Sequence, residues 1–180
     1  QLRVKKLLLP NEALTEESKR VQQEILAQAG RTQAHVVQGG ERYALDDNAE
    51  IVLVDVPQQD VPGNEASTLA ALQSVQGSVL FTGDMGEERE QRLQLQQYTV
   101  LKAGHHGSHY SSSMEFLEQV RPRLTVISCG RGNRYGHPHQ EKLERLQAIG
   151  SAVVRTHELG CIKVVFDAEG IKCYGYADLQ

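Results

Sequence analysis

Tryptophan is absent from this sequence of 180 residues, and aromatic residues make up only 5% of it. The hydrophobic fraction of 39% still suffices for one compact domain over residues 1–180, so aliphatic side chains must build its core. No run approaches roughly 18 consecutive apolar residues, which excludes an obvious membrane-spanning helix. We also expect no signal peptide.

Cysteine and net positive charge are scarce as well. Cys129, Cys161 and Cys173 are odd in number and lack the spacing of a metal finger, so we expect buried apolar thiols and no disulfide framework. The formal net charge of -4 excludes a global basic field that would attract nucleic acid. Any contact with nucleic acid must therefore be local.

The order of elements predicts a layered α/β fold with a mixed sheet, because strands and helices alternate in the second half of the chain. Helices are expected after Thr15, over residues 87–95, after Ser112 in a capping box with Glu115, and from about Pro138 to Ile149. Strands are expected at 4–9, 35–37, 51–56, 68–74, 78–82, 100–102, 124–128, near 153, at 162–166 and at 171–176.

Three loops, each after an apolar strand, concentrate the residues that can carry chemistry. In the first, Asp84 follows Gly83 at a strand end, where the sites of α/β proteins are usually built. Asp84 can be a metal-ligating carboxylate or only a turn-forming residue.

The second loop holds His105, His106 and His109 among glycines. Neutral imidazole is the commonest transition-metal ligand, although surface histidines of a polar loop are the plainer alternative. Lys102, on the preceding strand, can neutralise a phosphate or an oxyanion. We expect His109 to be the weakest candidate of the three histidines.

The third loop contains His137 before Pro138, together with Arg131 and Arg134. His137 can be a ligand, a proton carrier or merely a residue beside a helix start. The arginines can contact phosphate or simply be solvated. If the three loops meet at one sheet edge, their oxygen and imidazole donors suit Zn²⁺ or Mn²⁺, which would activate water for hydrolysis.

The combined motifs resemble the metallo-β-lactamase superfamily, and more narrowly the C-terminal domain of ComEC-type competence proteins, the bacterial DNA-uptake channels. The motifs are VLFTGD at 79–84, VLKAGHHGSHYSSS at 100–113, RPRLTVISCG at 121–130 and NRYGHPH at 133–139. The resemblance implies an αββα sandwich. It also implies that Asp84 bridges two metal ions and that His105, His106 and His137 are ligands or line the site.

By the same resemblance, Lys102 and Ser108 belong to a substrate-facing loop, and the position of Arg134 makes it a further candidate for substrate binding. Catalysis would then depend on Asp84, Lys102, His105 and His106, and the sequence leaves open which of the two histidines faces the metal. The implied partners are single-stranded DNA and the membrane channel part of the same polypeptide. This region would be a soluble domain of a bacterial membrane protein.

One hallmark of the superfamily, H-x-H-x-D-H, does not occur in the 180 residues. Because the chain begins at Gln1, we expect that the motif lies upstream and that the sandwich is incomplete. We therefore expect weak or no metal binding by this chain alone, and an exposed apolar sheet face that favours self-association.

The leading hypothesis is a fragment of a metal-dependent DNA phosphodiesterase. Two alternatives stay open. One is a hydrolase of the same superfamily that acts on another ester. The other is a non-catalytic domain with a degenerate metal site that binds a partner or single-stranded DNA.

Overall fold

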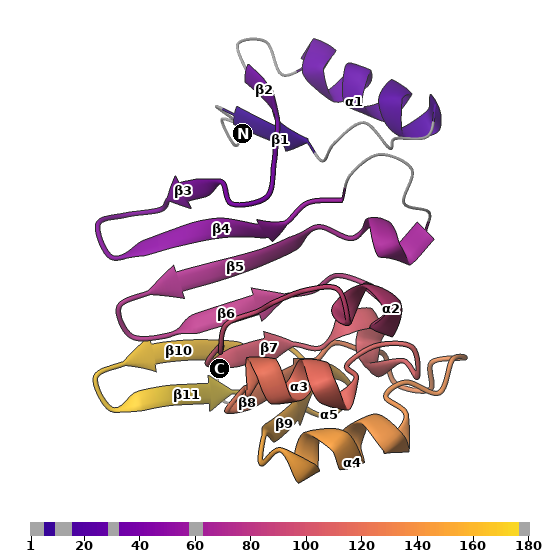
Figure 1. Cartoon of the computed structure of the whole chain (residues 1–180), viewed down its shortest axis with the longest axis vertical. Helices are drawn as coiled ribbons and strands as arrows, with labels where there is room; N and C mark the ends of the chain where they lie inside the picture. The colour runs from indigo at the N-terminus through magenta and orange to yellow at the C-terminus, as the bar shows by residue number, and fades with distance from the viewer. Residues whose placement is uncertain (1–5, 10–15, 29–32, 58–62, 177–180) are drawn as a thin grey trace.

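A seven-stranded sheet with the order β3-β4-β5-β6-β7-β8-β9 forms the centre of the molecule (Figure 1). The computed structural model describes residues 6–9, 16–28, 33–57 and 63–176. The strands of this sheet are β3 (Arg42–Ala44), β4 (Ala49–Asp55), β5 (Leu69–Ser74), β6 (Ser78–Phe81), β7 (Val100–Lys102), β8 (Leu124–Ile127) and β9 (Ala152–Arg155).

The sheet is mixed, as the sequence predicts. Strands β3 to β6 pair antiparallel, whereas β6, β7, β8 and β9 pair parallel. In the parallel half, Leu80 lies opposite Leu101, which lies opposite Thr125. The three residues share one face of the sheet and are fully buried, so the register is fixed by burial of that face.

Helices α2 (Glu87–Glu90), α3 (Met114–Val120) and α4 (Gln140–Ala148) cover one face of the sheet (Figure 1). Phe116 and Leu117 of α3 and Leu146 of α4 are buried there against Leu80 and Leu101. The core is largely aliphatic, in keeping with the scarcity of aromatic residues.

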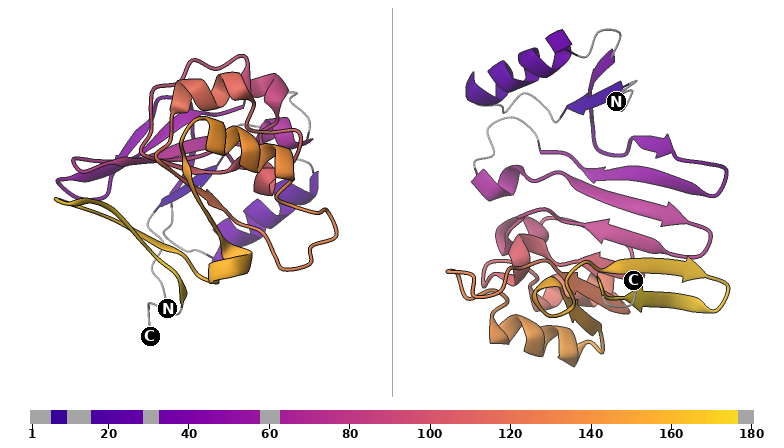
Figure 2. Two further views of the ribbon diagram at one scale, coloured as in Figure 1. Left: turned by 90° about the horizontal axis from the view of Figure 1, so that it is seen from below. Right: turned by 180° about the vertical axis from the view of Figure 1, so that it is seen from behind.

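Smaller elements lie on the opposite side of the sheet from α3 and α4 (Figure 2). They are the antiparallel hairpin of β10 (Lys163–Asp167) and β11 (Gly170–Tyr174), and the parallel pair β1 (Lys6–Leu9) and β2 (Gln33–Val36) with α1 (Glu16–Gln28) between them. Val37, Leu53 and Val56 form a second, smaller core. Among the described residues, the sheets on this side are two-stranded.

Several element boundaries differ from the sequence predictions. Helix α2 ends at Glu90 rather than at residue 95, and Ser113, not Ser112, caps α3 by accepting the Phe116 N–H at 3.2 Å. Helix α4 begins at Gln140, so Pro138 precedes it instead of forming its first turn. The expected cap at Thr15 lies outside the described residues.

Other elements were not predicted at all. They are strand β3, helix α5 (Thr156–Leu159) and the 3₁₀ turns η1 (Gly63–Ala66) and η2 (Gly104–Gly107). The expectation of buried thiols is wrong for Cys161 and Cys173, which are exposed, while Cys129 is half-buried. Over the described ranges, no helix combines the length and the apolar character needed to cross a membrane.

Candidate functional site

The three loops predicted to carry chemistry follow β6, β7 and β8, which are parallel neighbours in the sheet. Asp84 comes after β6, His105 and His106 come after β7, and His137 belongs to the loop after β8. The carboxyl ends of adjacent parallel strands meet at one edge, which is where α/β proteins place their sites. The predicted convergence at one sheet edge is confirmed.

Asp84 sits on a turn that is hydrogen-bonded to η1 and to Ser67, the residue that follows it. Its backbone N–H donates to the Ser67 hydroxyl at 3.0 Å, and the Gly86 N–H donates to the Glu65 carboxylate at 3.1 Å. Gly83 has a φ of 57°, and a Cβ there would lie 2.9 Å from Ser67. A larger residue at position 83 would therefore force Ser67 to shift, and the Ser67 hydroxyl accepts the Asp84 N–H.

Arg89 holds this turn in place, a role that no sequence pattern indicates. Its side chain is nearly buried and forms an ion pair with Asp55 of β4, with an Nε–Oδ2 distance of 3.0 Å. Its Nη1 donates to the carbonyl oxygens of Ser67, at 2.6 Å, and of Glu65. The pairing with Asp55 joins residues 34 positions apart, which no local pattern reveals.

The histidine loop has an unusual backbone. His105 and His106 adopt φ values of 43° and 56°, in the left-handed region that costs a non-glycine residue energy. The His106 Nδ1 donates to the Ser128 carbonyl at 2.6 Å, so this nitrogen carries the proton of the neutral ring. Its Nε2 then offers a lone pair, and it lies 3.7 Å from Oδ1 of Asp84.

His137 brings the third loop to the other two. Its ring centroid is 5.9 Å from that of His105 and 6.5 Å from that of His106. Burial, and then the neighbouring histidines, lower the pKa of His137 below its ordinary value, which favours the neutral ring. The loops touch at Gly107, where an added Cβ would lie 2.8 Å from Cβ of Pro138.

A buried carboxylate binds the backbone of the segment that follows the histidine loop. Glu90 is 1% exposed and accepts the backbone N–H groups of Ser112 and Ser113 at 2.5 and 2.8 Å. Burial raises the pKa of Glu90. Ser108, predicted to contact substrate, is only 3% exposed, so it could reach a ligand only if the loop moved.

Two cationic side chains lie at this edge. Lys102 is half-buried at the end of β7, and its Nζ donates to the Ala103 carbonyl at 2.9 Å. Burial lowers the pKa of Lys102, and the Asp84 carboxylate opposes that shift. Arg134 is exposed, with its guanidinium 4.7 Å from the ring centroid of Tyr135.

The predicted metal ligands lie close together, but they do not form a complete metal site. Over the part of the chain that the structure describes, no group of three or more His, Cys, Asp or Glu side chains is placed to hold a metal ion. A catalytic zinc site needs three protein ligands. The donor chemistry of Asp84 and His106 suits a metal, but this set does not fit one by itself.

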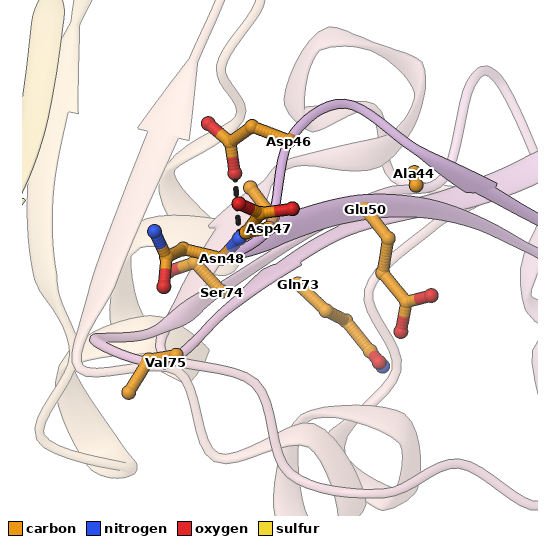
Figure 3. A pocket seen from close by; sticks show the side chains of 9 residues that line it. Ala44, Asp46, Asp47, Asn48, Glu50, Gln73, Ser74 and Val75 are labelled. Atoms are coloured by element: carbon orange, nitrogen blue, oxygen red, sulfur yellow. Dashed lines mark hydrogen bonds between the residues drawn. The ribbon is translucent and has the colours of Figure 1, made fainter.

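A second hollow lies at the opposite edge of the sheet (Figure 3). It is formed by the turn before β4 and the end of β5, and it presents the carboxylates of Asp46, Asp47 and Glu50. Asp46 Oδ1 accepts the Asn48 N–H at 2.7 Å, as an Asx turn does. This acidic surface is unsuited to a phosphate ligand.

The chain is similar in sequence to a known protein family and to several known proteins. The sequence profile of the metallo-beta-lactamase superfamily matches residues 35–131. ComE operon protein 3 of Bacillus subtilis is 32% identical over 89% of the chain, and Recombination protein 2 of Haemophilus influenzae is 40% identical over 57% of it. Competence protein ComA of Neisseria gonorrhoeae is 31% identical over 64%. The chain spans only 21%, 13% and 17% of these relatives, respectively.

Proposed function

Because the chain belongs to the metallo-β-lactamase superfamily, we propose that it supplies part of the active site of a metal-dependent phosphodiesterase acting on single-stranded DNA. The observation that carries this proposal is the meeting of Asp84, Lys102, His106 and His137 at the carboxyl ends of β6, β7 and β8. A carboxylate, an ammonium group and imidazoles at one edge are the groups that phosphodiester hydrolysis uses.

Charge supports a phosphate ligand at this edge. The chain as a whole is acidic, yet Lys102, Arg131 and Arg134 belong to the loops and strand that end here. Negative charge on the non-bridging oxygens would be stabilised by the Lys102 ammonium group, which is partly shielded from water. The exposed arginines would position the backbone of the nucleic acid.

The histidines suit proton handling. His106 is oriented by its bond to Ser128, which leaves Nε2 as the free nitrogen beside Asp84. His137 favours its neutral form because burial and its neighbours lower its pKa, so it could accept a proton at neutral pH. The ligands that would complete a metal site are not in this donor set.

The names of the relatives favour a role in DNA uptake. Two of the three are called competence or ComE operon proteins, and the third is called a recombination protein. We infer that the region acts within a larger membrane-associated competence protein. Single-stranded DNA is the ligand that this setting suggests.

The test is divalent-metal-dependent cleavage of end-labelled single-stranded DNA by the full-length gene product, with Mn²⁺ or Zn²⁺ added after chelation. We expect Asp84→Asn to lower the cleavage rate by roughly 100-fold or more. The matched control is Asp46→Asn in the acidic turn at the opposite edge, which should keep the native rate. Equal rates for native protein and Asp84→Asn would remove Asp84 from the mechanism.

One observation favours a second candidate, a non-catalytic domain that binds single-stranded DNA. It is the lack, within the described ranges, of a three-donor group that could hold a metal. If the full-length product binds DNA with either metal but never cleaves it, the binding domain is the better account. Lys102→Met should then weaken binding and reduce its salt dependence.

A further inference from the structure

A cavity adjoins the candidate site, and two of its lining residues belong to both. It has a volume of about 340 Å³, and His106 and His137 line it. The remaining wall comes from the loop after β8 and the start of α5, including Cys129, Asn133, Tyr135 and Thr156. A group in this cavity would therefore lie beside a phosphodiester bound at the candidate site.

The walls of the cavity are suited to a flat ligand. The rings of Tyr135 and His137 are nearly parallel, at 26°, with centroids 5.7 Å apart. Tyr135 is 60% exposed, and the Arg134 guanidinium lies over its ring. Aromatic rings with an adjacent arginine are the combination on which single-stranded nucleic acids stack their bases.

Two polar side chains of the wall, Asn133 and Thr156, are already hydrogen-bonded. Asn133 donates to the carbonyls of Gly130 and His137 at 3.0 and 2.7 Å and accepts the His137 N–H at 2.9 Å. The Thr156 hydroxyl bonds to the backbone N–H and carbonyl of Cys129, both at 2.9 Å. These bonds stiffen the cavity and leave few groups to read the edge of a base.

The charge of the lining also disfavours a phosphate group as the ligand of this cavity. Neither lysine nor arginine is among the described residues that line the cavity, whereas Lys102 and Arg134 lie nearby. We infer that this cavity is a subsite for a nucleobase, stacked on Tyr135 and His137, next to the site that holds the phosphodiester. The recognition is by stacking and is tolerant of base identity.

The inference rests on the proposed function, since it takes single-stranded DNA as the ligand of the neighbouring site. The test compares two fluorescent probes on this chain by anisotropy, in EDTA and at one fixed salt concentration. One probe is oligothymidylate, and the other is an abasic oligonucleotide with the same number of phosphates. Keeping the phosphates equal separates base stacking from electrostatic binding.

Tyr135→Ala should weaken binding of oligothymidylate roughly tenfold and leave the abasic probe unaffected. Tyr135→Phe should retain most of the affinity, because the stacking ring remains. The matched control is Tyr110→Ala, which removes a tyrosine that is even more exposed and does not line the cavity. It should change neither affinity.

The outcomes separate the two proposals. If native protein binds both probes equally, or if Tyr135→Ala weakens both alike, the base subsite is wrong while the phosphodiester site stands. If native protein binds neither probe, the base subsite is wrong, and the proposed function is decided separately by the cleavage test on the full-length product. Displacement of the probe by N-acetyltyrosine amide but not by thymidine would assign the cavity to an aromatic side chain and overturn the nucleobase inference.

Discussion

A buried ion pair behind the site gives a quantitative prediction. Lys142 of α4 is 1% exposed, and its Nζ lies 2.8 Å from Oε1 of Glu87. The same oxygen accepts a bond from Arg145 at 2.7 Å. Burial alone would raise the pKa of Glu87, but the bonds from Lys142 and Arg145 outweigh it and lower that pKa.

Glu87→Ala should be costly because it leaves the Lys142 ammonium buried and unpaired. Breaking a buried pair in this way costs about 3–5 kcal/mol. The Glu87 side chain is 32% exposed, so water can reach the vacated place and the cost should fall near the lower end, ~3 kcal/mol. Lys142→Met removes the charge and keeps the volume, so it should cost less than about 1 kcal/mol.

Urea unfolding measures both effects. With a slope of about 2 kcal/mol per molar urea, Glu87→Ala should lower the midpoint by ~1.5 M, and Lys142→Met should lower it by less than ~0.5 M. Glu88→Ala is the matched control, since Glu88 is exposed and pairs only at the surface with Arg92. Equal losses for Glu87→Ala and Lys142→Met would refute the reasoning that an unpaired buried charge sets the cost.

Three further variants probe the loops and the sheet edge. Gly107→Ala should destabilise the fold by about 1–3 kcal/mol in urea unfolding, because φ is 81° and the new Cβ would meet Pro138; full stability would disprove the close approach. His105→Gly should be as stable as the native chain or more stable by up to ~1 kcal/mol, because it relieves a left-handed φ; a clear loss would show that the ring itself stabilises the fold. Hydrogen bonds, of which the one from Tyr43 has the largest effect, lower the pKa of Glu41 to about 2. The stabilisation that the Glu41 carboxylate gives relative to Glu41→Gln should therefore be complete above pH 4.5 and be lost as the pH falls through 2. The difference in urea midpoint between native protein and Glu41→Gln is measured across this range. An equal difference at pH 2 and at pH 6 would contradict the last prediction.

The arrangement of the candidate site could be predicted because it depends on strand order. Asp84, the histidine loop and His137 each follow an apolar run, and neighbouring parallel strands bring such loops to one edge. The mixed sheet and the aliphatic core were predictable from the same runs. In each of these runs, the apolar residues that form a strand lie within a few positions of one another, so the sequence alone reveals them.

The supporting contacts could not be predicted, because they join distant parts of the chain. Arg89 reaches Asp55, and Glu90 binds the backbone of Ser112 and Ser113. The contact with Glu90 also explains the shifted helix cap, since Ser112 adopts a φ of 58° and its N–H is taken by Glu90. Capping of α3 is left to Ser113.

Short elements also could not be predicted from the sequence. Strand β3 has only three residues, and its mixed pattern gains meaning only through pairing with β4. Helix α2 stops at Glu90, and the Leu93 and Leu95 side chains pack against the core without continuing it. In this segment, the burial of individual side chains has more influence on where the helix ends than local helix propensity has.

The most direct test of the central claim is to map oligothymidylate binding on this chain by ¹H–¹⁵N NMR in EDTA. The account predicts shifts of the backbone amides of residues 103–109 and 130–137, at the carboxyl ends of β7 and β8, with the acidic turn at 46–50 unchanged. Shifts confined to the acidic turn, or none at the histidine loop at saturating DNA, would contradict it.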